Sequence, residues 1–251
     1  MRKNIAVVIL AAGLGTRMKS DKAKVLHEVA GRPMILYVVE AARKTVGDDI
    51  IVVVGNQAQK VREIISETAD LQFAYQEQQL GTAHAVLCAL PHIPDHCDEV
   101  VILCGDVPLL LPETIAGLVE DHLACHREVS LLAVELKNPY GYGRVLVDDN
   151  GQVTGIIEEA DASSEQRKIR LINAGIYCVN KQFLQEALPK VQSNNAQEEL
   201  YLTDIMALGH KEKKKMGVMI TADYLQILGV NNCQNLEAVD KIMKKRMRNI
   251  S

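Results

Sequence analysis

The residues with the clearest chemical potential lie near the start of the chain, where an apolar segment meets a glycine-rich turn and two cations. Residues 8–18 read Val-Ile-Leu-Ala-Ala-Gly-Leu-Gly-Thr-Arg-Met. Gly13 and Gly15 let backbone N–H groups approach an anion closely, while Arg17 and Lys24 supply fixed positive charge. Together these features predict a site for nucleotide phosphates.

The spacing differs from two commoner phosphate-binding motifs. A Walker loop has a lysine directly after its final glycine, and the dinucleotide fingerprint has a third glycine where Met18 stands. The alternative for a lone Gly-x-Gly is a strand turn whose glycines only permit tight packing. The flanking residues favour the phosphate site.

Several later blocks strengthen this interpretation, because with the loop they resemble the signature of the sugar-1-phosphate nucleotidyltransferase family. The chain resembles most the uridylyltransferase half of the bacterial bifunctional enzyme that makes UDP-N-acetylglucosamine. The blocks occur in order along nearly the whole chain: Lys-Val-Leu at 24–26, Gln-Leu-Gly-Thr at 79–82, Gly-Asp-Val-Pro-Leu at 105–109, Gly-Tyr-Gly-Arg at 141–144, Asn-Ala-Gly at 173–175, Tyr-Leu-Thr-Asp at 201–204 and Gly-Val-Asn-Asn at 229–232.

Asp106 is the candidate magnesium ligand. It follows an apolar run at 100–104, so we expect its side chain at the carboxyl edge of a sheet, where ligands bind in open α/β folds. Magnesium prefers oxygen donors, and the resemblance implies Asn231 as the second ligand. Without the resemblance, Gly-Asp is a turn after a strand and Asn231 is a helix cap. The match of both blocks to one family favours the metal site.

The resemblance implies that the substrates are UTP and N-acetylglucosamine 1-phosphate and that the cofactor is Mg²⁺. The candidate catalytic residues, Arg17 and Lys24, would stabilise the β- and γ-phosphates as pyrophosphate leaves. Lys24 is preferred to Lys19 and Lys22 because it alone begins the Lys-Val-Leu block. The candidate metal ligands are Asp106 and Asn231, and the candidate substrate-binding residues are Ala11, Ala12, Gly13, Gly15, Gln76, Gly81, Thr82, Gly143, Glu158, Asn173 and Asn231.

Two of these residues have explicit alternatives. Gln76 is assigned to the uracil base, since a primary amide can donate to a carbonyl and accept from N3–H, but a glutamine in such a polar run is ordinarily solvated. Glu158 is assigned to the sugar phosphate and has an immediate rival in Glu159, which strand alternation places on the opposite face.

Two other functions stay open. One is a relative that acts on another sugar phosphate or pyrimidine nucleotide. The other is a non-catalytic sugar-nucleotide sensor or assembly subunit. Retention of both cations and both metal ligands argues against the sensor, because binding alone does not need them all.

The pattern of apolar segments predicts an α/β fold. Strand-like runs at 5–10, 50–54, 100–104 and 130–134 alternate with helical patterns at 33–45 and 57–67, which predicts a Rossmann-like, mostly parallel sheet with helices on both faces. Pro33 and Pro112 are expected at the first position of a helix. The resemblance implies the nucleotide-diphospho-sugar transferase fold for a domain over residues 1–234.

Near residue 140 the sequence pattern changes from alternating strands and helices to two strand-like runs around a turn. Runs at 144–148 and 152–158 flank Asp-Asn-Gly at 149–151, a strong hairpin signal, so we expect an antiparallel insertion near 140–175. A strand at 171–179 and helices at 181–188 and 200–211 complete the predicted domain.

Residues 235–251 are predicted as a basic C-terminal helix with an apolar stripe. A solvated cap packed on the domain is favoured over a helix on an anionic membrane surface. In the family that the chain resembles, a helix here leads into a left-handed β-helix acetyltransferase domain. The chain stops at Ser251, so we expect neither acetyl transfer nor trimerisation through such a domain, and the oligomeric state is left open.

Composition sets broad limits. The 251 residues are 48% hydrophobic and 24% charged with a net charge of −4, which is ordinary for a globular protein and argues against a nucleic-acid partner. The absence of an apolar run of about 20 residues predicts no membrane insertion and a cytoplasmic location.

The six cysteines are interpreted as buried reduced thiols, because they are scattered and no Cys-x-x-Cys occurs. Two histidine and cysteine clusters, within 84–97 and 122–126, are interpreted as structural or surface residues. In the first cluster Pro91 and Pro94 prevent the donors from lining one helical face.

Overall fold

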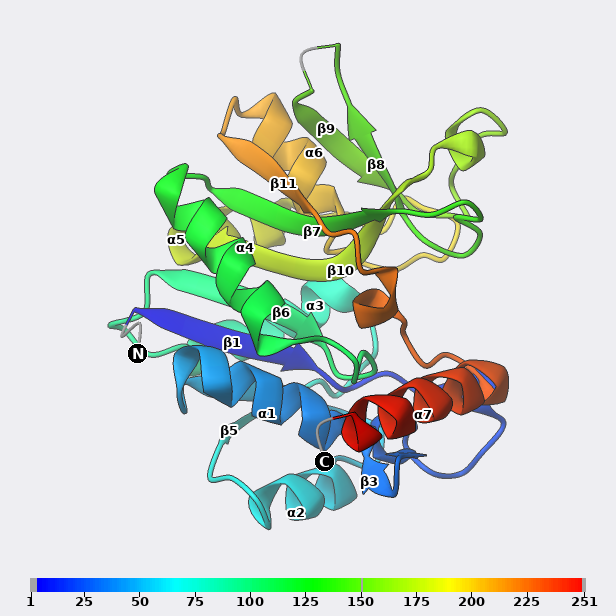
Figure 1. Ribbon diagram of the computed structural model, residues 1–251. Coiled ribbons are helices and arrows are strands. Elements are labelled where there is room, and N and C mark those ends of the chain that lie inside the picture. Colours follow the sequence, from blue (N-terminus) through cyan, green and yellow to red (C-terminus); the bar gives the residue numbers. More distant parts are fainter. Residues whose placement is uncertain (1–3, 150, 250–251) are drawn as a thin grey trace.

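A mixed sheet forms the centre of the computed structural model, which describes residues 4–149 and 151–249 (Figure 1). Asn150, the middle residue of the predicted hairpin turn, lies outside the described residues. Within the described residues the sheet has nine strands in the order β11-β7-β10-β6-β1-β4-β5, with β8 and β9 attached through β10. One set of strands is parallel: β1 (Ile5–Leu10), β4 (Ile50–Val54), β5 (Gln72–Tyr75), β6 (Glu99–Cys104), β7 (Val129–Glu135) and β11 (Met216–Ile220). Strand β10 (Leu171–Asn180) runs antiparallel between β6 and β7.

Helices cover both faces of the sheet, as predicted. In β1, Val7 and Ile9 face one core cluster and Ala6 and Val8 face the other, which explains why the strand is apolar at every position. The first cluster is completed by α1 (Met34–Val46), α2 (Ala58–Ser66) and α4 (Pro112–Ala124). The second is completed by α3 (Thr82–Ala89), α5 (Lys181–Ala187) and α6 (Asp204–Lys211).

Most predicted elements are present with small shifts at their ends. Pro112 is the first residue of α4, as predicted, whereas Pro33 precedes α1 as its cap. Pro33 belongs to the short strand β3 (Arg32–Pro33), which pairs with β2 (Glu28–Val29). The sequence did not predict the edge strands β5 and β11. Strand β5 is only four residues long, and within it only Ala74 is buried.

The helix predicted over 200–211 is wrong at its start, since α6 begins at Asp204. The backbone of residues 200–202 bonds to another segment instead. Leu200 N donates to Leu80 O at 2.7 Å, and Leu202 N donates to Thr82 Oγ1 at 2.9 Å. Leu200 O, which a helix starting here would use to accept from Asp204 N, accepts instead from Ala83 N at 2.9 Å, and these bonds join the segment to the start of α3.

The predicted antiparallel hairpin consists of β8 (Arg144–Val147) and β9 (Val153–Ile157). Strand β8 joins the main sheet through the pairing of Arg144 with Ile172 of β10. Because β10 is antiparallel to β6, its first residues and the attached hairpin lie at the carboxyl end of β6.

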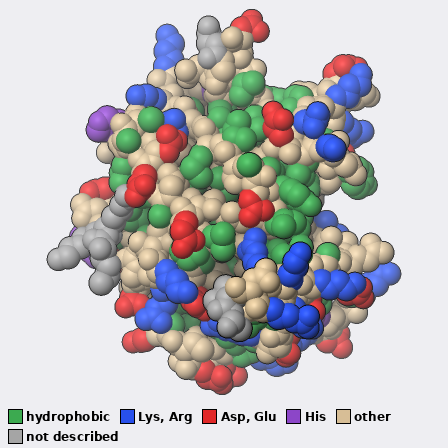
Figure 2. All heavy atoms as spheres, in the orientation of Figure 1, with side chains coloured by type: hydrophobic (Ala, Val, Ile, Leu, Met, Phe, Trp, Pro, Cys, Tyr) green, Lys and Arg blue, Asp and Glu red, His purple; other side chains and the backbone are tan. Residues whose placement is uncertain are grey.

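The C-terminal helix α7 (Cys233–Arg248) packs its apolar stripe on the domain, as the cap interpretation predicted. Val239 and Met243 join Met18 in a third buried cluster, and Asp240 Oδ1 accepts a hydrogen bond from Ala30 N at 2.8 Å. Lysine and arginine side chains gather on the outer surface of the helix (Figure 2). Among the described residues, no helix has the length and apolarity to cross a membrane.

We expect Val239→Asp to release α7 from the domain, because it places a carboxylate in an apolar cluster where Val239 is 1% exposed. Burying an unpaired charge should lower the free energy of α7 opening by about 2 kcal/mol or more. Hydrogen exchange of the α7 amides measures this change. Ala238→Asp is the matched control, since Ala238 is exposed on the same helix. Equal protection in the two variants would contradict the packing described here.

Candidate active site

The glycine-rich loop leaves β1 at the carboxyl edge of the sheet and turns back toward Lys24. Gly15 has a φ of 65°, and a Cβ there would lie 2.8 Å from Lys24 Cβ. Glycine at this position therefore serves both the turn and the close approach of the two segments. Met18, which stands where a dinucleotide fingerprint has glycine, is buried and anchors the loop in the cluster under α7.

Asp106 lies at the tip of β6, as predicted. Gly105 N donates to Leu10 O at 2.9 Å, and a Cβ on Gly105 would lie 3.1 Å from that same oxygen, so the tips of β6 and β1 meet without an intervening side chain. The backbone carbonyl of Asp106 accepts from Val230 N at 2.9 Å. This bond brings the segment that carries Asn231 to the same edge.

Four of the predicted residues converge on one point. Lys24 Nζ lies 2.6 Å from Asp106 Oδ2 and 3.2 Å from Asn231 Oδ1, across a separation of 207 residues in the second case. Arg17 Nη2 donates to the same Asn231 oxygen at 3.4 Å. The side chains of Lys24 and Asp106 are 19% and 15% exposed, so this charged pair is partly withdrawn from water.

The structure also resolves the competing interpretations of Asn231 and Lys24. Asn232 caps α7, accepting from Asn235 N at 2.8 Å, which leaves the Asn231 side chain to face the two cations. Lys22 pairs loosely with Glu28 at 3.7 Å and stays exposed. Lys24 alone of the nearby lysines contacts Asp106 within the described chain.

A second group of residues, among them the predicted Gly143, surrounds Glu158. Thr203 Oγ1 donates to Glu158 Oε1 at 3.1 Å, and a Cβ on Gly143 would lie 3.3 Å from Glu158 Oε2. Burial raises the pKa of Glu158, and the charges of Asp161 and Asp204 add to that effect, while the Thr203 hydrogen bond opposes it.

Glu159, the rival of Glu158, is engaged elsewhere. It forms a 2.6 Å ion pair with the buried guanidinium of Arg144 and accepts from Gly141 N at 3.1 Å. Arg144 lowers the pKa of Glu159. Its contacts make Glu159 a support for the 141–144 loop, whereas Glu158 is held by Thr203 beside Gly143.

Asn173 lies between Gly143, to whose carbonyl its backbone N–H donates, and Gly175, which contacts the tip of β6. Its Nδ2 donates to Tyr177 Oη at 2.7 Å, and its Oδ1 accepts from Gly175 N at 2.9 Å. Gly175 O in turn accepts from the Cys104 thiol at 3.4 Å, two residues before Asp106. Burial raises the pKa of Cys104 to about 12, and the charge of Asp106 contributes to this rise.

Gln76 is not the solvated residue that its polar surroundings predicted, since it is 3% exposed. Its Nε2 donates to Gly81 O at 3.0 Å and lies 3.0 Å from His84 Nδ1. Thr82 Oγ1 accepts a hydrogen bond from Leu202 N, which joins the segment after Gln76 to the segment that carries Thr203. Ala11 and Ala12 are buried at the end of β1, and Gly13 is exposed with open space around its Cβ position.

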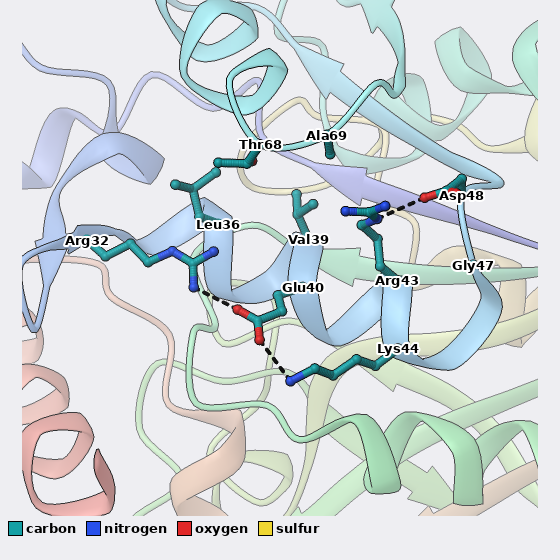
Figure 3. A pocket seen from close by; sticks show the side chains of 10 residues that line it. All are labelled: Arg32, Leu36, Val39, Glu40, Arg43, Lys44, Gly47, Asp48, Thr68 and Ala69. Carbon is teal, nitrogen blue, oxygen red and sulfur yellow. Dashed lines mark hydrogen bonds and ion pairs between the residues drawn. The ribbon is translucent and has the colours of Figure 1, made fainter. Parts of the chain in front are cut away.

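A groove between α1 and the segment after α2 is separate from this constellation (Figure 3). Among the described residues that line it, none is a predicted site residue. Each of its three cations is paired: Arg32 and Lys44 share Glu40, and Arg43 pairs with Asp48. A phosphate in this groove would have to compete with these carboxylates.

Comparisons with known proteins agree with the geometry. The family model described as Nucleotidyl transferase matches residues 6–226. The chain belongs to the nucleotidyl transferase family. Similar proteins named "Bifunctional protein GlmU" come from Geotalea daltonii (44% identity, covering 97% of this chain and 53% of that protein) and Desulfotalea psychrophila (44%, covering 96% and 71%).

This nucleotidyl transferase spans about half the length of the first curated relatives it matches. It also has the fold of a proposed glucose-1-phosphate thymidylyltransferase from Bacillus anthracis, solved in complex with sucrose. The two structures superpose with a TM-score of 0.75 at 18% identity, covering 95% of this chain and 94% of the other. The predicted nucleotide-diphospho-sugar transferase fold is confirmed.

The sequence missed two residues of this nucleotidyl transferase that the structure adds to the site. Thr203 holds Glu158, and Tyr142 lies close enough to Asp106 for that charge to add to the burial that raises the Tyr142 pKa. Both stand inside family blocks, Tyr-Leu-Thr-Asp and Gly-Tyr-Gly-Arg, so block membership was the available signal.

We expect Gly81→Ala to lower the free energy of unfolding of this nucleotidyl transferase by about 2 kcal/mol or more. Gly81 has a φ of 119°, and a Cβ there would lie 2.4 Å from Leu200 O, so both the backbone and the neighbouring segment must shift. Chemical denaturation measures the change. Gly13→Ala is the control and should stay within about 0.5 kcal/mol of the parent. A Gly81→Ala protein as stable as the control would show that the 200–202 contact is not required.

Proposed function

We propose that the chain transfers UMP from UTP to N-acetylglucosamine 1-phosphate and releases pyrophosphate in a Mg²⁺-dependent reaction. The convergence of Arg17, Lys24, Asp106 and Asn231 is the observation that carries the proposal. The family supports nucleotidyl transfer in general. The choice of UTP and of this sugar rests on the sequence blocks that resemble uridylyltransferases.

The donor set of the site fits a magnesium ion. Asp106 Oδ2 and Asn231 Oδ1 both approach one ammonium, that of Lys24, so two oxygen donors already face a single cation. A carboxylate and an amide oxygen, with water and phosphate completing the coordination, suit magnesium. When bound, Mg²⁺ would neutralise phosphate charge and hold the triphosphate for in-line attack.

The protein's own cations would then serve the leaving group. A phosphate oxygen of the sugar phosphate attacks the α-phosphorus of UTP, a new P–O bond forms, and the bond between the α-phosphorus and the bridging oxygen breaks. The attacking oxygen is already anionic, so no general base is needed. Arg17 and Lys24 would hold the β- and γ-phosphates and stabilise the charge that builds on departing pyrophosphate.

The remaining residues would select the two substrates. Gln76 Nε2 already donates to Gly81 O and lies beside His84 Nδ1. The amide oxygen of Gln76 is therefore the atom left to accept a hydrogen bond from uracil N3–H. Glu158, fixed by Thr203 and beside Gly143, would accept hydrogen bonds from sugar hydroxyls or the N-acetyl group. Asn173 and the backbone at Gly143 are joined by a 2.9 Å hydrogen bond and would form the wall beside it.

We expect Asp106→Ala to lower the turnover number by about 100-fold or more, because losing one pre-organised transition-state stabiliser costs about 3–4 kcal/mol. Pyrophosphate release from UTP, N-acetylglucosamine 1-phosphate and Mg²⁺ measures it, with the exposed Asp70→Ala as control. Near-normal turnover of Asp106→Ala would remove Asp106 from the metal site.

The same assay separates the alternative functions. Comparing UTP with dTTP and CTP, and several sugar phosphates, tests the substrate choice. Calorimetry that shows UDP-sugar binding without any turnover would favour the sensor.

We expect Lys24→Met to bind a divalent ion more tightly than the parent when no nucleotide is present, while losing turnover. The Lys24 ammonium competes for Asp106 Oδ2 and Asn231 Oδ1, so its removal frees both oxygens. The expected gain in Mn²⁺ affinity is about tenfold or more, judged from the Coulomb energy of such a pair. Electron paramagnetic resonance of free Mn²⁺ measures it. Lys22→Met should leave the affinity unchanged, and an equal affinity of Lys24→Met and the parent would contradict the competition.

A further inference from the structure

Three side chains that ligate transition metals converge at the amino edge of the sheet, opposite the edge that carries the active site. Asp49 directly precedes β4, and His96 and Cys97 lie just before β6, so the donors flank the start of β1. The carboxylate, imidazole and thiol donor atoms all lie within 4.8 Å of one another. His96 Nε2 and Asp49 Oδ2 are 3.0 Å apart, in a partly exposed hydrogen bond or ion pair that an ion would replace.

The separation of His96 Nε2 and Asp49 Oδ2 is close to that of two ligand atoms on a tetrahedral ion. Zinc bonds to nitrogen and oxygen of about 2.0–2.1 Å, at tetrahedral angles, place the two ligand atoms about 3.3 Å apart. The His96 to Asp49 separation therefore needs only a small adjustment to admit the ion. One sulfur, one nitrogen and one oxygen donor form a set that zinc-type ions prefer to magnesium.

The three donor side chains differ in exposure: the thiol is buried, and the imidazole and the carboxylate reach solvent. Cys97 is 1% exposed, while the side chains of His96 and Asp49 are 55% and 33% exposed. An ion can thus enter from solvent past the imidazole and the carboxylate, and it would meet the thiol below. Within the described chain, the Cys97 thiol has no hydrogen-bond partner.

The backbone around the donors is already fixed. Val7 N donates to Asp49 O at 2.9 Å, which ties Asp49 to β1. Cys97 N closes a turn on Pro94 O at 3.1 Å, and Asp98 N donates to Asn4 O at 2.9 Å. Little ordering of the chain is therefore needed when an ion binds.

Burial, with a contribution from nearby carboxylates, favours the protonated form of the Cys97 thiol when no ion is bound. Burial raises the pKa of Cys97 to about 11, and the charges of Asp49 and Asp98 add to it, while Lys181 acts in the opposite direction. The Lys181 ammonium is held on Pro94 O at 3.0 Å. An ion that replaces the thiol proton would offset the repulsion between the sulfur and the two carboxylates.

A second cluster of similar composition, Glu99, His122 and Cys178, is a weaker candidate. His122 is 1% exposed and already uses both ring nitrogens, one with Ser130 Oγ at 2.9 Å and one with Glu99 Oε2 at 3.1 Å. An ion would have to displace a satisfied buried hydrogen-bond network there.

We propose that Asp49, His96 and Cys97 bind one zinc-type transition-metal ion, with water in the fourth position. The Cys97 S–H proton passes to solvent, a metal–sulfur bond forms, and neither metal nor sulfur changes oxidation state. The ion fastens the chain before β4 to the chain before β6 and so stabilises the fold. It takes no part in the transfer reaction, because the candidate active site is at the other edge of the sheet.

The test uses the full chain, freed of metal by a chelator and titrated with Co²⁺ alone. We expect the visible bands of tetrahedral cobalt together with a thiolate-to-cobalt charge-transfer band, and both should disappear when Zn²⁺ is added. His96→Ala should weaken Co²⁺ binding by roughly 100-fold or more, since even residues around metal ligands are worth about 10–100-fold in affinity. Cys97→Ser should lose the charge-transfer band.

Matched controls make each outcome decisive. His92→Ala changes an exposed histidine four residues before His96, and Cys88→Ser changes the cysteine whose sulfur lies 3.8 Å from His84 Nε2. Both controls should keep the parent spectrum. A parent protein without a charge-transfer band, or a band lost in Cys88→Ser and kept in Cys97→Ser, would overturn the proposal.

Two further measurements separate this site from the reaction and from a folding defect. Zn²⁺ should raise the melting temperature of the parent and leave those of His96→Ala and Asp49→Asn unchanged. These two variants change partly exposed side chains, so they test the site without disturbing the core even if Cys97→Ser folds poorly. Pyrophosphate release with Mg²⁺ should be the same in His96→Ala and the parent. Equal melting shifts in all three proteins would contradict the site, whatever the outcome of the transfer assay.

Discussion

The contact between Lys24 and Asp106 is the interaction on which the site depends. An ammonium and a carboxylate lie 2.6 Å apart in a partly buried position, with the Asn231 oxygen beside them. Leaving either charge unpaired there would cost several kcal/mol. In the proposed reaction a magnesium–triphosphate complex would satisfy both at once, because the metal would take the oxygens and the phosphates would take the lysine. Without substrate, Lys24 neutralises Asp106, and Arg17 keeps a positive charge beside the pair.

The topology of the sheet explains why segments so distant in sequence can share this point. The tips of β1 and β6 meet because Gly105 has no side chain to separate them. The reversed direction of β10 brings Asn173 and the Glu158 hairpin to the same edge. Helix α7 completes the site from the far end of the chain, since its cap at Asn232 and its buried stripe fix Asn231.

Strands buried on both faces could be predicted from sequence, because every position of β1 and β4, and every position of β6 after Glu99, is apolar. Edge strand β5 could not, since it has four residues and only one of them is buried. Residues 200–203 carry a helical pattern, but hydrogen bonds to the start of α3 override it. The family blocks selected Asn231 and Glu158 as candidates, and the contacts add why their neighbours differ: Asn232 caps α7 and Glu159 pairs with Arg144. The approach of Asp49 to His96 has no sequence signal.

The most direct test of the convergent site is a crystal structure of the chain with Mn²⁺ and a non-hydrolysable UTP analogue, in which anomalous scattering locates the ion. We predict one strong anomalous peak within coordination distance of Asp106 and Asn231, with the β- and γ-phosphates beside Arg17 and Lys24. An ion bound to the triphosphate away from both oxygens, or a triphosphate bound away from the 13–17 loop, would contradict this assignment.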